Sequence, residues 1–256
     1  MAVDYKKEGR IATFTINRPE AMNAMSVQAW RELSAAMLEF RDDPEVWVGI
    51  ITAVGEKAFC AGADIKDLLP FMKEKRETPW QIPYTHMRGL DLWKPLIAAI
   101  NGVALGGGLE IVLGCDIRIA AEHARLGVPE VTLGIIPGWG GTQRLPRMIP
   151  WCKAAELVLT GKLIDAQEAY RIGLINQVVP LAELMPKAKE WAEALCRPAP
   201  LAVRAAKEAM VRGTSMPLDE GLRLESALFA YLQGTEDFTE GTKAFAEKRK
   251  PNFKAK

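Results

Sequence analysis

The pattern of apolar and polar positions predicts strands separated by helices over the first part of the chain. Residues 10–17 alternate apolar and polar side chains, as a half-buried strand does. Ser26 then precedes apolar residues at helical spacing, which predicts an amphipathic helix over 26–41 with Ser26 as its N-cap. Short apolar runs predict further strands, at 46–52, 96–100, 117–120 and 174–179. This order of strands and helices is typical of an α/β architecture.

The last part of the chain shows helical spacing only. It predicts four helices with no strand among them, at 181–196, 201–212, 217–232 and 235–248. We therefore expect a core domain with the active site, residues 1–196, followed by a C-terminal helical region, residues 197–256. Helices of this kind need a surface to pack on, so we expect them to contact the core domain or another subunit.

Composition and charge favour an ordinary soluble globular protein. Hydrophobic residues make up 49% of the chain, charged residues 25%, and the net charge is +1. These values give no reason to expect a nucleic acid or a membrane as partner. The apolar stretch 96–114 is long enough to suggest a membrane span, but it contains Asn101-Gly102, three consecutive glycines and Glu110. We expect a buried strand, turn and helix there instead.

Cysteine and histidine usage argues against a disulfide scaffold and against a metal site. The four cysteines lie far apart and form no C-x-x-C pair, and the two histidines have no metal-ligand spacing. We expect no metal, and we expect the cysteines to be small buried apolar residues in a reducing compartment. The charged first residues do not fit a signal or transit peptide, so we expect a cytoplasmic location.

The first candidate for chemistry is the glycine run 106–108 followed by Glu110. The run lies after a predicted strand and before a helix, where free backbone N–H groups suit a developing oxyanion. Close packing between strand and helix explains the glycines equally well. Glu110 is surrounded by apolar residues, which favours a carboxyl group that lines a pocket with a raised pKa.

Two other segments add candidates. Glu130 follows Gly127-Val128-Pro129, where a carboxylate more often stabilises a helix start than acts as a catalyst. The small residues of 61–63 can expose backbone N–H groups, and Asp64 after them is equally typical of an N-cap. There is no G-x-S-x-G serine motif. Two carboxylates and two small-residue loops without metal ligands indicate acid–base chemistry on a polarised carbonyl.

Several segments, in this order, resemble the crotonase superfamily, and enoyl-CoA hydratase most closely. They are NRPEAMNAMS (17–26), GEKAFCAGADIKDL (55–68), the long stretch 94–147, LTGKLIDAQEAYRIGLINQVVP (159–180) and AFAEKRKPNF (244–253). The resemblance runs nearly end to end. It implies an α/β fold, a crotonase-like spiral of repeated β-β-α units with a C-terminal helical trimerisation region. It also implies a homo-trimer or a hexamer that is a dimer of trimers.

The resemblance further implies an activity and a catalytic set. The expected reaction adds water to a trans-2-enoyl-CoA to give a 3-hydroxyacyl-CoA, as in fatty acid β-oxidation. The expected partner is the acyl-CoA thioester, and no cofactor is needed because coenzyme A is part of the substrate. The N–H groups of Ala63 and Gly107 match the oxyanion hole. Glu110 matches the residue that takes a proton from water, and Glu130 the residue that delivers a proton to C2.

Other positions match family contacts to the substrate. The loop that includes Ala63 matches a segment that contacts coenzyme A, Gly138 matches a residue that helps hold the attacking water, and the C-terminal positions match a part that reaches a neighbouring subunit's coenzyme A. The expected substrate-binding residues are Ala24, Ala61, Asp64, Ile65, Lys66, Gly138, Phe245 and Lys248.

Two departures from the family pattern bear on specificity. Trp139 is larger than the small residue expected between the glycines of P-G-x-G-G, and the segment 69–88, with Phe71, Trp80 and Tyr84, varies in the family. Both can shape the acyl pocket. A different crotonase-type activity stays open: enoyl-CoA isomerase, acyl-CoA hydrolase, decarboxylase, dehalogenase, or hydratase for a branched or cyclic substrate. An RNA-binding homologue is less favoured, because the charge is neutral overall and both glutamates are present.

Overall fold

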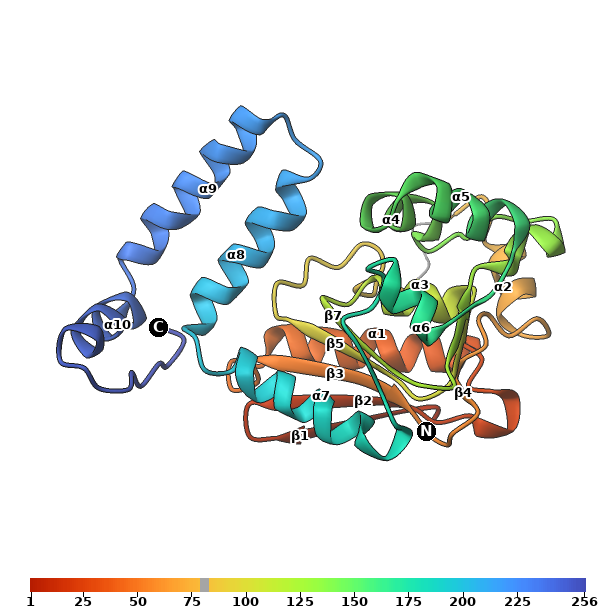
Figure 1. Ribbon diagram of the computed structural model, residues 1–256, viewed down its shortest axis with the longest axis horizontal. Helices are drawn as coiled ribbons and strands as arrows, with labels where there is room; N and C mark the ends of the chain where they lie inside the picture. The colour runs from red at the N-terminus through yellow and green to blue at the C-terminus, as the bar shows by residue number, and fades with distance from the viewer. Residues whose placement is uncertain (79–82) are drawn as a thin grey trace.

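The computed structural model describes residues 1–78 and 83–256. Trp80, one of the aromatic residues that we singled out as variable, lies outside the described residues. The chain forms a layered α/β body from which the C-terminal helices extend to one side (Figure 1).

A six-stranded sheet forms the base of the body. Its strands, in spatial order, are β1 (Val3–Glu8), β2 (Ile11–Ile16), β3 (Val48–Ala53), β5 (Leu96–Ile100), β7 (Ile117–Ala121) and β10 (Gln177–Val179). Among the described strands of this sheet, only the neighbours β1 and β2 run antiparallel. The predicted strands are confirmed, although the last begins later than expected because Leu174 and Ile175 are buried in a turn before it. β1 was not predicted, since as an edge strand it buries little of its length.

A second sheet of four short strands stands beside the first. It consists of β4 (Ala58–Cys60), β6 (Val103–Leu105), β8 (Arg125–Gly127) and β9 (Ile164–Asp165). The pairs β3–β4, β5–β6 and β7–β8 therefore each place one strand in each sheet. Helical segments follow these pairs: α2 (Leu68–Glu74), α3 (Gly107–Leu113), and η3 (Pro129–Leu133) with α4 (Gly141–Met148). The predicted spiral of repeated β-β-α units is confirmed.

Helices cover both faces of the large sheet. α1 (Val27–Asp42) packs its apolar stripe, Trp30 to Phe40, against one face, and Ser26 is its N-cap as predicted, because its Oγ accepts from the Ala29 N–H at 3.0 Å. α7 (Leu181–Leu195) packs against the opposite face. Side chains of a strand alternate between the two faces of the sheet. Ile51 of β3 therefore belongs to the apolar core on the α1 side, and Ile50 to the apolar core on the α7 side.

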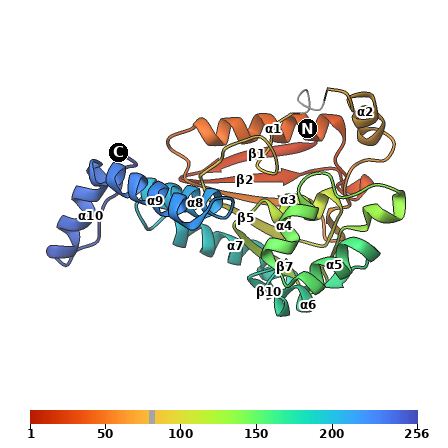
Figure 2. The same cartoon turned by 90° about the horizontal axis from the view of Figure 1, so that it is seen from above.

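The C-terminal helices are α8 (Pro200–Gly213), α9 (Leu218–Gln233) and α10 (Glu236–Ala246), and they follow α7 without a strand, as predicted. They project from the body in both views (Figures 1 and 2). Several of their large apolar side chains are exposed, and Phe245 is 88% exposed. The chain end folds back onto α10, where the Asp237 carboxylate accepts from the N–H groups of Lys254 and Ala255 at 2.7 and 2.9 Å.

The apolar stretch 96–114 divides into β5, β6 and α3. The predicted strand and helix are confirmed as β5 and α3, whereas the short strand β6 between them was not predicted. Across residues 1–78 and 83–256, no helix combines the length and the apolar character that crossing a membrane requires. The prediction for the cysteines is only partly correct. Cys60 and Cys115 are buried, but Cys196 is partly exposed and Cys152 is exposed at the start of α5 (Trp151–Thr160), where helical rotation turns it away from the core.

Candidate active site

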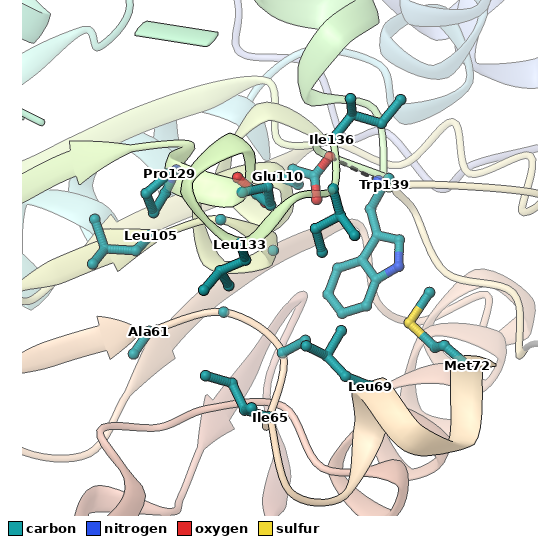
Figure 3. A pocket seen from close by; sticks show the side chains of 17 residues that line it. Ala61, Ile65, Leu69, Met72, Leu105, Glu110, Pro129, Leu133, Ile136 and Trp139 are labelled. Atoms are coloured by element: carbon teal, nitrogen blue, oxygen red, sulfur yellow. Dashed lines mark hydrogen bonds between the residues drawn. The ribbon is translucent and has the colours of Figure 1, made fainter. Parts of the chain in front are cut away.

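The site is a pocket at the ends of the short strands. Three segments meet there: the loop after β4, the N-terminus of α3 after β6, and the segment 129–139 after β8, with α2 closing one side (Figure 3). Most of the lining is apolar or backbone, and two carboxyl groups enter it. The lining residues are Ala61, Gly62, Ala63, Ile65, Leu69, Met72, Leu105, Gly106, Gly107, Glu110, Pro129, Glu130, Leu133, Ile135, Ile136, Gly138 and Trp139.

Glu110 lies in the first turn of α3 and is 1% exposed. Its Oε1 accepts two hydrogen bonds, from the backbone N–H groups of Trp139 and Gly141, both at 2.7 Å. Gly141 has to be a glycine, because a Cβ there would lie 3.2 Å from this oxygen and 2.7 Å from Pro137. One oxygen of Glu110 is thereby fixed by the loop before α4.

The pKa of Glu110 is raised to about 7. Burial away from water is the main cause, because it penalises the charged form. The two backbone N–H groups and the Arg144 guanidinium lower the pKa, whereas the nearby carboxylate of Glu130 raises it. The carboxyl group can therefore gain or lose a proton near neutral pH, as the sequence predicted for a pocket-lining acid.

Glu130 enters the same pocket from the first turn of η3. Burial raises the pKa of its carboxyl group above the ordinary value. Its Oε2 is buried and has no hydrogen-bond partner among the described residues. The carboxyl group lies against Gly106, where a Cβ would be 2.9 Å from Oε1. Glu130 is thus both a helix-start residue and a pocket carboxyl group, so the two interpretations of its position do not exclude each other.

The backbone on the facing loop leaves the Ala63 N–H without a partner among the described residues. The Met25 N–H donates to the Gly62 carbonyl and the Asp64 N–H donates to the Met25 carbonyl, both at 2.8 Å. In this parallel bridge Ala63 is the residue between the two bonds, so its own N–H points the other way. Gly62, at φ +104°, lies close to the start of α3, because a Cβ added to Gly62 would be 3.6 Å from the Gly107 nitrogen.

Gly107 is the first residue of α3, where the N–H has no partner within the helix. The Ala63 and Gly107 N–H groups therefore come from neighbouring loops that line the same pocket. The packing explanation for the glycine run holds at Gly108, and the oxyanion explanation stays a prediction. Gly108 is needed for packing, because a Cβ would lie 2.0 Å from the Cys60 carbonyl oxygen, whereas Gly106 makes room for the Glu130 carboxyl group.

The expected substrate-binding residues separate into two groups. Ala61, Ile65 and Gly138 line the pocket. Ala24, Asp64 and Lys66 lie outside its wall: the carbonyl of Ala24 and the carboxylate of Asp64 both accept from Arg18, and the Lys66 N–H donates to Asp64. The Asp64 side chain thus stabilises the turn before α2. The helix itself begins after Asp67.

The two C-terminal residues of the expected set are not brought to the pocket within one chain. Phe245 lies in the last turn of α10 and Lys248 follows it, on the helices that project from the body (Figure 1).

Sequence reasoning missed Arg144 of α4. Its Nη1 donates to the Trp139 carbonyl at 2.9 Å and its Nη2 to the Met87 carbonyl at 2.6 Å. It thereby ties the loop that holds Glu110 to the segment at Met87. The only sequence signal is a glycine at 140, where φ is +117° and a Cβ would meet Nη1 at 1.9 Å.

The described residues contain no cluster of three or more histidine, cysteine or acidic side chains that can hold a metal ion. The chemistry that the described groups offer is a pair of carboxyl groups, one with a pKa of about 7, facing two backbone donors. This arrangement can polarise a carbonyl oxygen while protons move at a neighbouring carbon.

Comparisons with known proteins agree with this geometry. The profile of the family "Enoyl-CoA hydratase/isomerase" matches residues 6–256. The chain is 46% identical to a short-chain-enoyl-CoA hydratase of Clostridium acetobutylicum, over 96% of this chain and 94% of the relative. It is 42% identical to an (E)-benzylidenesuccinyl-CoA hydratase of Thauera aromatica, over 99% of each. The crystal structure of an enoyl-CoA hydratase from Bacillus anthracis superposes with a TM-score of 0.94, at 42% identity and full coverage of both chains.

Proposed function

The chain belongs to the enoyl-CoA hydratase/isomerase family and acts as an enoyl-CoA hydratase, and from that premise we propose that Glu110 and Glu130 move the protons of the reaction. The reaction adds water to the double bond of a trans-2-enoyl-CoA and gives a 3-hydroxyacyl-CoA. The observation that carries the proposal is that both carboxyl groups line one pocket together with Ala63 and Gly107.

The backbone donors act on the thioester. Its oxygen would accept hydrogen bonds from the N–H groups of Ala63 and Gly107, which draws electron density from the conjugated double bond and makes C3 electrophilic. The bonds strengthen as negative charge develops on the oxygen, so they stabilise the transition state more than the bound substrate. Gly107 also lies at a helix N-terminus, where the backbone carries partial positive charge.

The two glutamates then divide the proton transfers. The water oxygen bonds to C3 while Glu110 takes one of its protons, and the electron pair of the double bond moves toward the thioester oxygen. Glu130 delivers a proton to C2 as the carbonyl re-forms. Glu110 begins ionised and Glu130 protonated, so the pair holds one proton. Two nearby carboxylates in a poorly hydrated site do not both ionise easily, which favours a pair that holds one proton.

Substitution of either glutamate tests the proposal. We expect Glu110→Gln and Glu130→Gln each to lower kcat by about 10²-fold or more, because each removes a positioned acid or base. The change is nearly isosteric, so both variants should remain folded and bind the thioester. Turnover is measured by the loss of enoyl-thioester absorbance with trans-2-butenoyl-CoA. Near-normal hydration by a purified variant would remove that residue from the mechanism.

We propose substrate contacts for the remaining expected residues. The loop at Ala63 to Lys66 would contact coenzyme A, with Ala24, Ala61 and Asp64 supporting it, and Gly138 would help hold the attacking water. No cofactor is needed, as is usual for the family. Fatty acid β-oxidation and a cytoplasmic location stay predictions.

We also propose that residues 1–196 form the catalytic domain and that residues 197–256 assemble the chain into a homo-trimer or a dimer of trimers. The exposed apolar side chains of the projecting helices support this, since large exposed apolar surfaces usually mark interfaces. They include Met210, Leu218, Leu222, Phe229, Tyr231, Phe238 and Phe245. In such an assembly Phe245 and Lys248 can reach a neighbouring subunit's coenzyme A.

A further inference from the structure

We infer that the indole of Trp139, backed by Trp30, closes the acyl end of the pocket and restricts the enzyme to short acyl groups. The inference extends the proposed function and rests on it, because it assigns the acyl group to the apolar part of the pocket next to Glu110.

The indole lies directly against the start of α3. A Cβ added to Gly107 would be 2.3 Å from Cζ3 of Trp139 and 2.7 Å from Cε3, so the ring touches the glycine itself. The side chain reaches down from the loop before α4 toward Leu69 and Met72 of α2 (Figure 3). It is therefore a wall of the pocket, immediately beside an expected oxyanion-hole residue.

Trp30 holds this wall in place from behind. The two indoles meet edge to face, with ring centroids 3.9 Å apart and an interplanar angle of 86°. Trp30 belongs to α1 and is 4% exposed, and its Nε1 donates to the Pro83 carbonyl at 2.9 Å. Trp139 is itself only 5% exposed. Because cores are close-packed, the ring has no free space behind it into which it can swing.

The backbone of Trp139 is fixed as well. Its N–H donates to Glu110 Oε1 at 2.7 Å, and its carbonyl accepts from Arg144 at 2.9 Å. The distance from the catalytic carboxyl group to the indole is thus set by bonds at both ends of one residue. The backbone of Trp139 binds the Glu110 carboxyl group and its side chain forms the pocket wall. A substitution of the side chain therefore keeps the N–H that binds Glu110.

The space that remains suits a compact acyl group. The cavity measures about 160 Å³. Its wall next to Trp139 continues with the apolar side chains of Leu69, Met72 and Ile136, so additional methylene groups would meet packed side chains. Each methylene that does not fit costs binding in such a pocket, by roughly 10-fold or more. We therefore expect a steep decline in activity with acyl length.

The test compares two substrates in four proteins. We expect the wild type to have a kcat/KM at least about 10-fold higher with trans-2-butenoyl-CoA than with trans-2-decenoyl-CoA, and Trp139→Ala to reduce that ratio by about 10-fold or more. Trp139→Leu, which leaves a smaller cavity next to Trp30, should give an intermediate ratio. Trp151→Ala is the matched control, because that side chain is 74% exposed on α5 and lies outside the pocket, and its ratio should equal that of the wild type.

Two kinetic results would overturn the inference: equal kcat/KM values for both substrates in the wild type, or an unchanged ratio in variants that circular dichroism shows to be folded. Affinity for the saturated thioesters butyryl-CoA and decanoyl-CoA separates this inference from the proposed function. If hydration fails but the wild type binds butyryl-CoA more tightly and Trp139→Ala removes that preference, the pocket wall is as inferred and the proposed chemistry is wrong. If affinity does not depend on length in this way, the inference is wrong whatever the turnover.

Discussion

A single carboxyl oxygen connects the pocket chemistry to the loop before α4. Oε1 of Glu110 accepts from the N–H of Trp139 in that loop and from the N–H of Gly141, the first residue of α4, which leaves the other oxygen available to act on water. Because burial raises the pKa to about 7, small changes in the surroundings of this group change its charge at neutral pH. At the residue scale, activity should therefore follow the protonation of the carboxyl pair.

We expect kcat/KM to have a bell-shaped dependence on pH. Glu110 has to be ionised to accept a proton from water, so activity rises as pH increases through the first ionisation of the pair. Glu130 has to be protonated, and burial raises its pKa too, so activity falls when the second proton is lost. The two limbs belong to the pair rather than to single residues. Initial rates with trans-2-butenoyl-CoA between pH 5 and 9 measure the profile, and a flat profile would contradict the assignment.

The site could be predicted in part from single residues. Glu110 was recognisable because a carboxyl group among apolar neighbours has to be explained by a pocket. Glu130 and Ala63 were ambiguous from their neighbours alone, and only the resemblance gave them roles. The contact of Trp139 with Gly107 and Trp30 could not be predicted, because it joins residues from three separate elements.

At the scale of elements, the helix α4 positions the loop that holds Glu110. Arg144 is largely buried in that helix and bonds to two carbonyls, one of the loop and one of the segment at Met87. We infer that it is a positioning residue for Glu110, since its guanidinium also lowers the pKa of that carboxyl group.

We expect Arg144→Met to lower kcat/KM by about 10-fold or more, because buried carbonyls lose a charged donor and the loop loosens. The acidic limb of the pH profile should also move to higher pH, because a positive charge near Glu110 is removed. A purely structural role would leave the limb where it is. Arg147→Met is the matched control, since Arg147 lies in the same helix and bonds only to Gln143 among the described residues.

Long elements were predictable and short ones were not. The predicted bounds of α1 and of the C-terminal helices agree with the observed bounds to within a few residues, because each helix repeats its apolar spacing over several turns. The strands of the four-stranded sheet have three residues or fewer, which is too short for a period to be seen. They are nevertheless the strands whose ends form the pocket, so the sequence pattern alone could not place its residues together.

At the scale of the whole molecule, we propose that the projecting helices determine the assembly. We expect light scattering to find a homo-trimer or a hexamer, because closed cyclic symmetry would bury the exposed apolar side chains of every subunit. Phe229→Glu, on α9, should weaken the assembly by placing a charge in the interface, and Trp151→Glu, at an exposed tryptophan of α5, is its control. A stable, active monomer of the wild type would contradict the proposal.

The proposed assembly also predicts a contact between Lys248 and a neighbouring subunit's coenzyme A, which a substitution can test. We expect Lys248→Ala to raise KM more than it lowers kcat, because a lysine near the coenzyme A phosphates acts as a point charge on binding. The increase should shrink at high salt, where exposed charges are screened. Lys6→Ala, on β1, is the matched control. An unchanged KM at low salt would contradict the phosphate contact and leave the assembly untouched.

The order of the strands has a consequence for how the chain acquires its structure. In both sheets the strands lie side by side in the order in which they occur in the sequence, from β1 to β10 and from β4 to β9. Each new strand therefore joins an open edge, and none has to be inserted between two strands that are already paired. Since chains fold from the N-terminus as they leave the ribosome, both sheets can grow strand by strand during translation. The projecting helices emerge last, after the surface on which the catalytic pocket is built has formed.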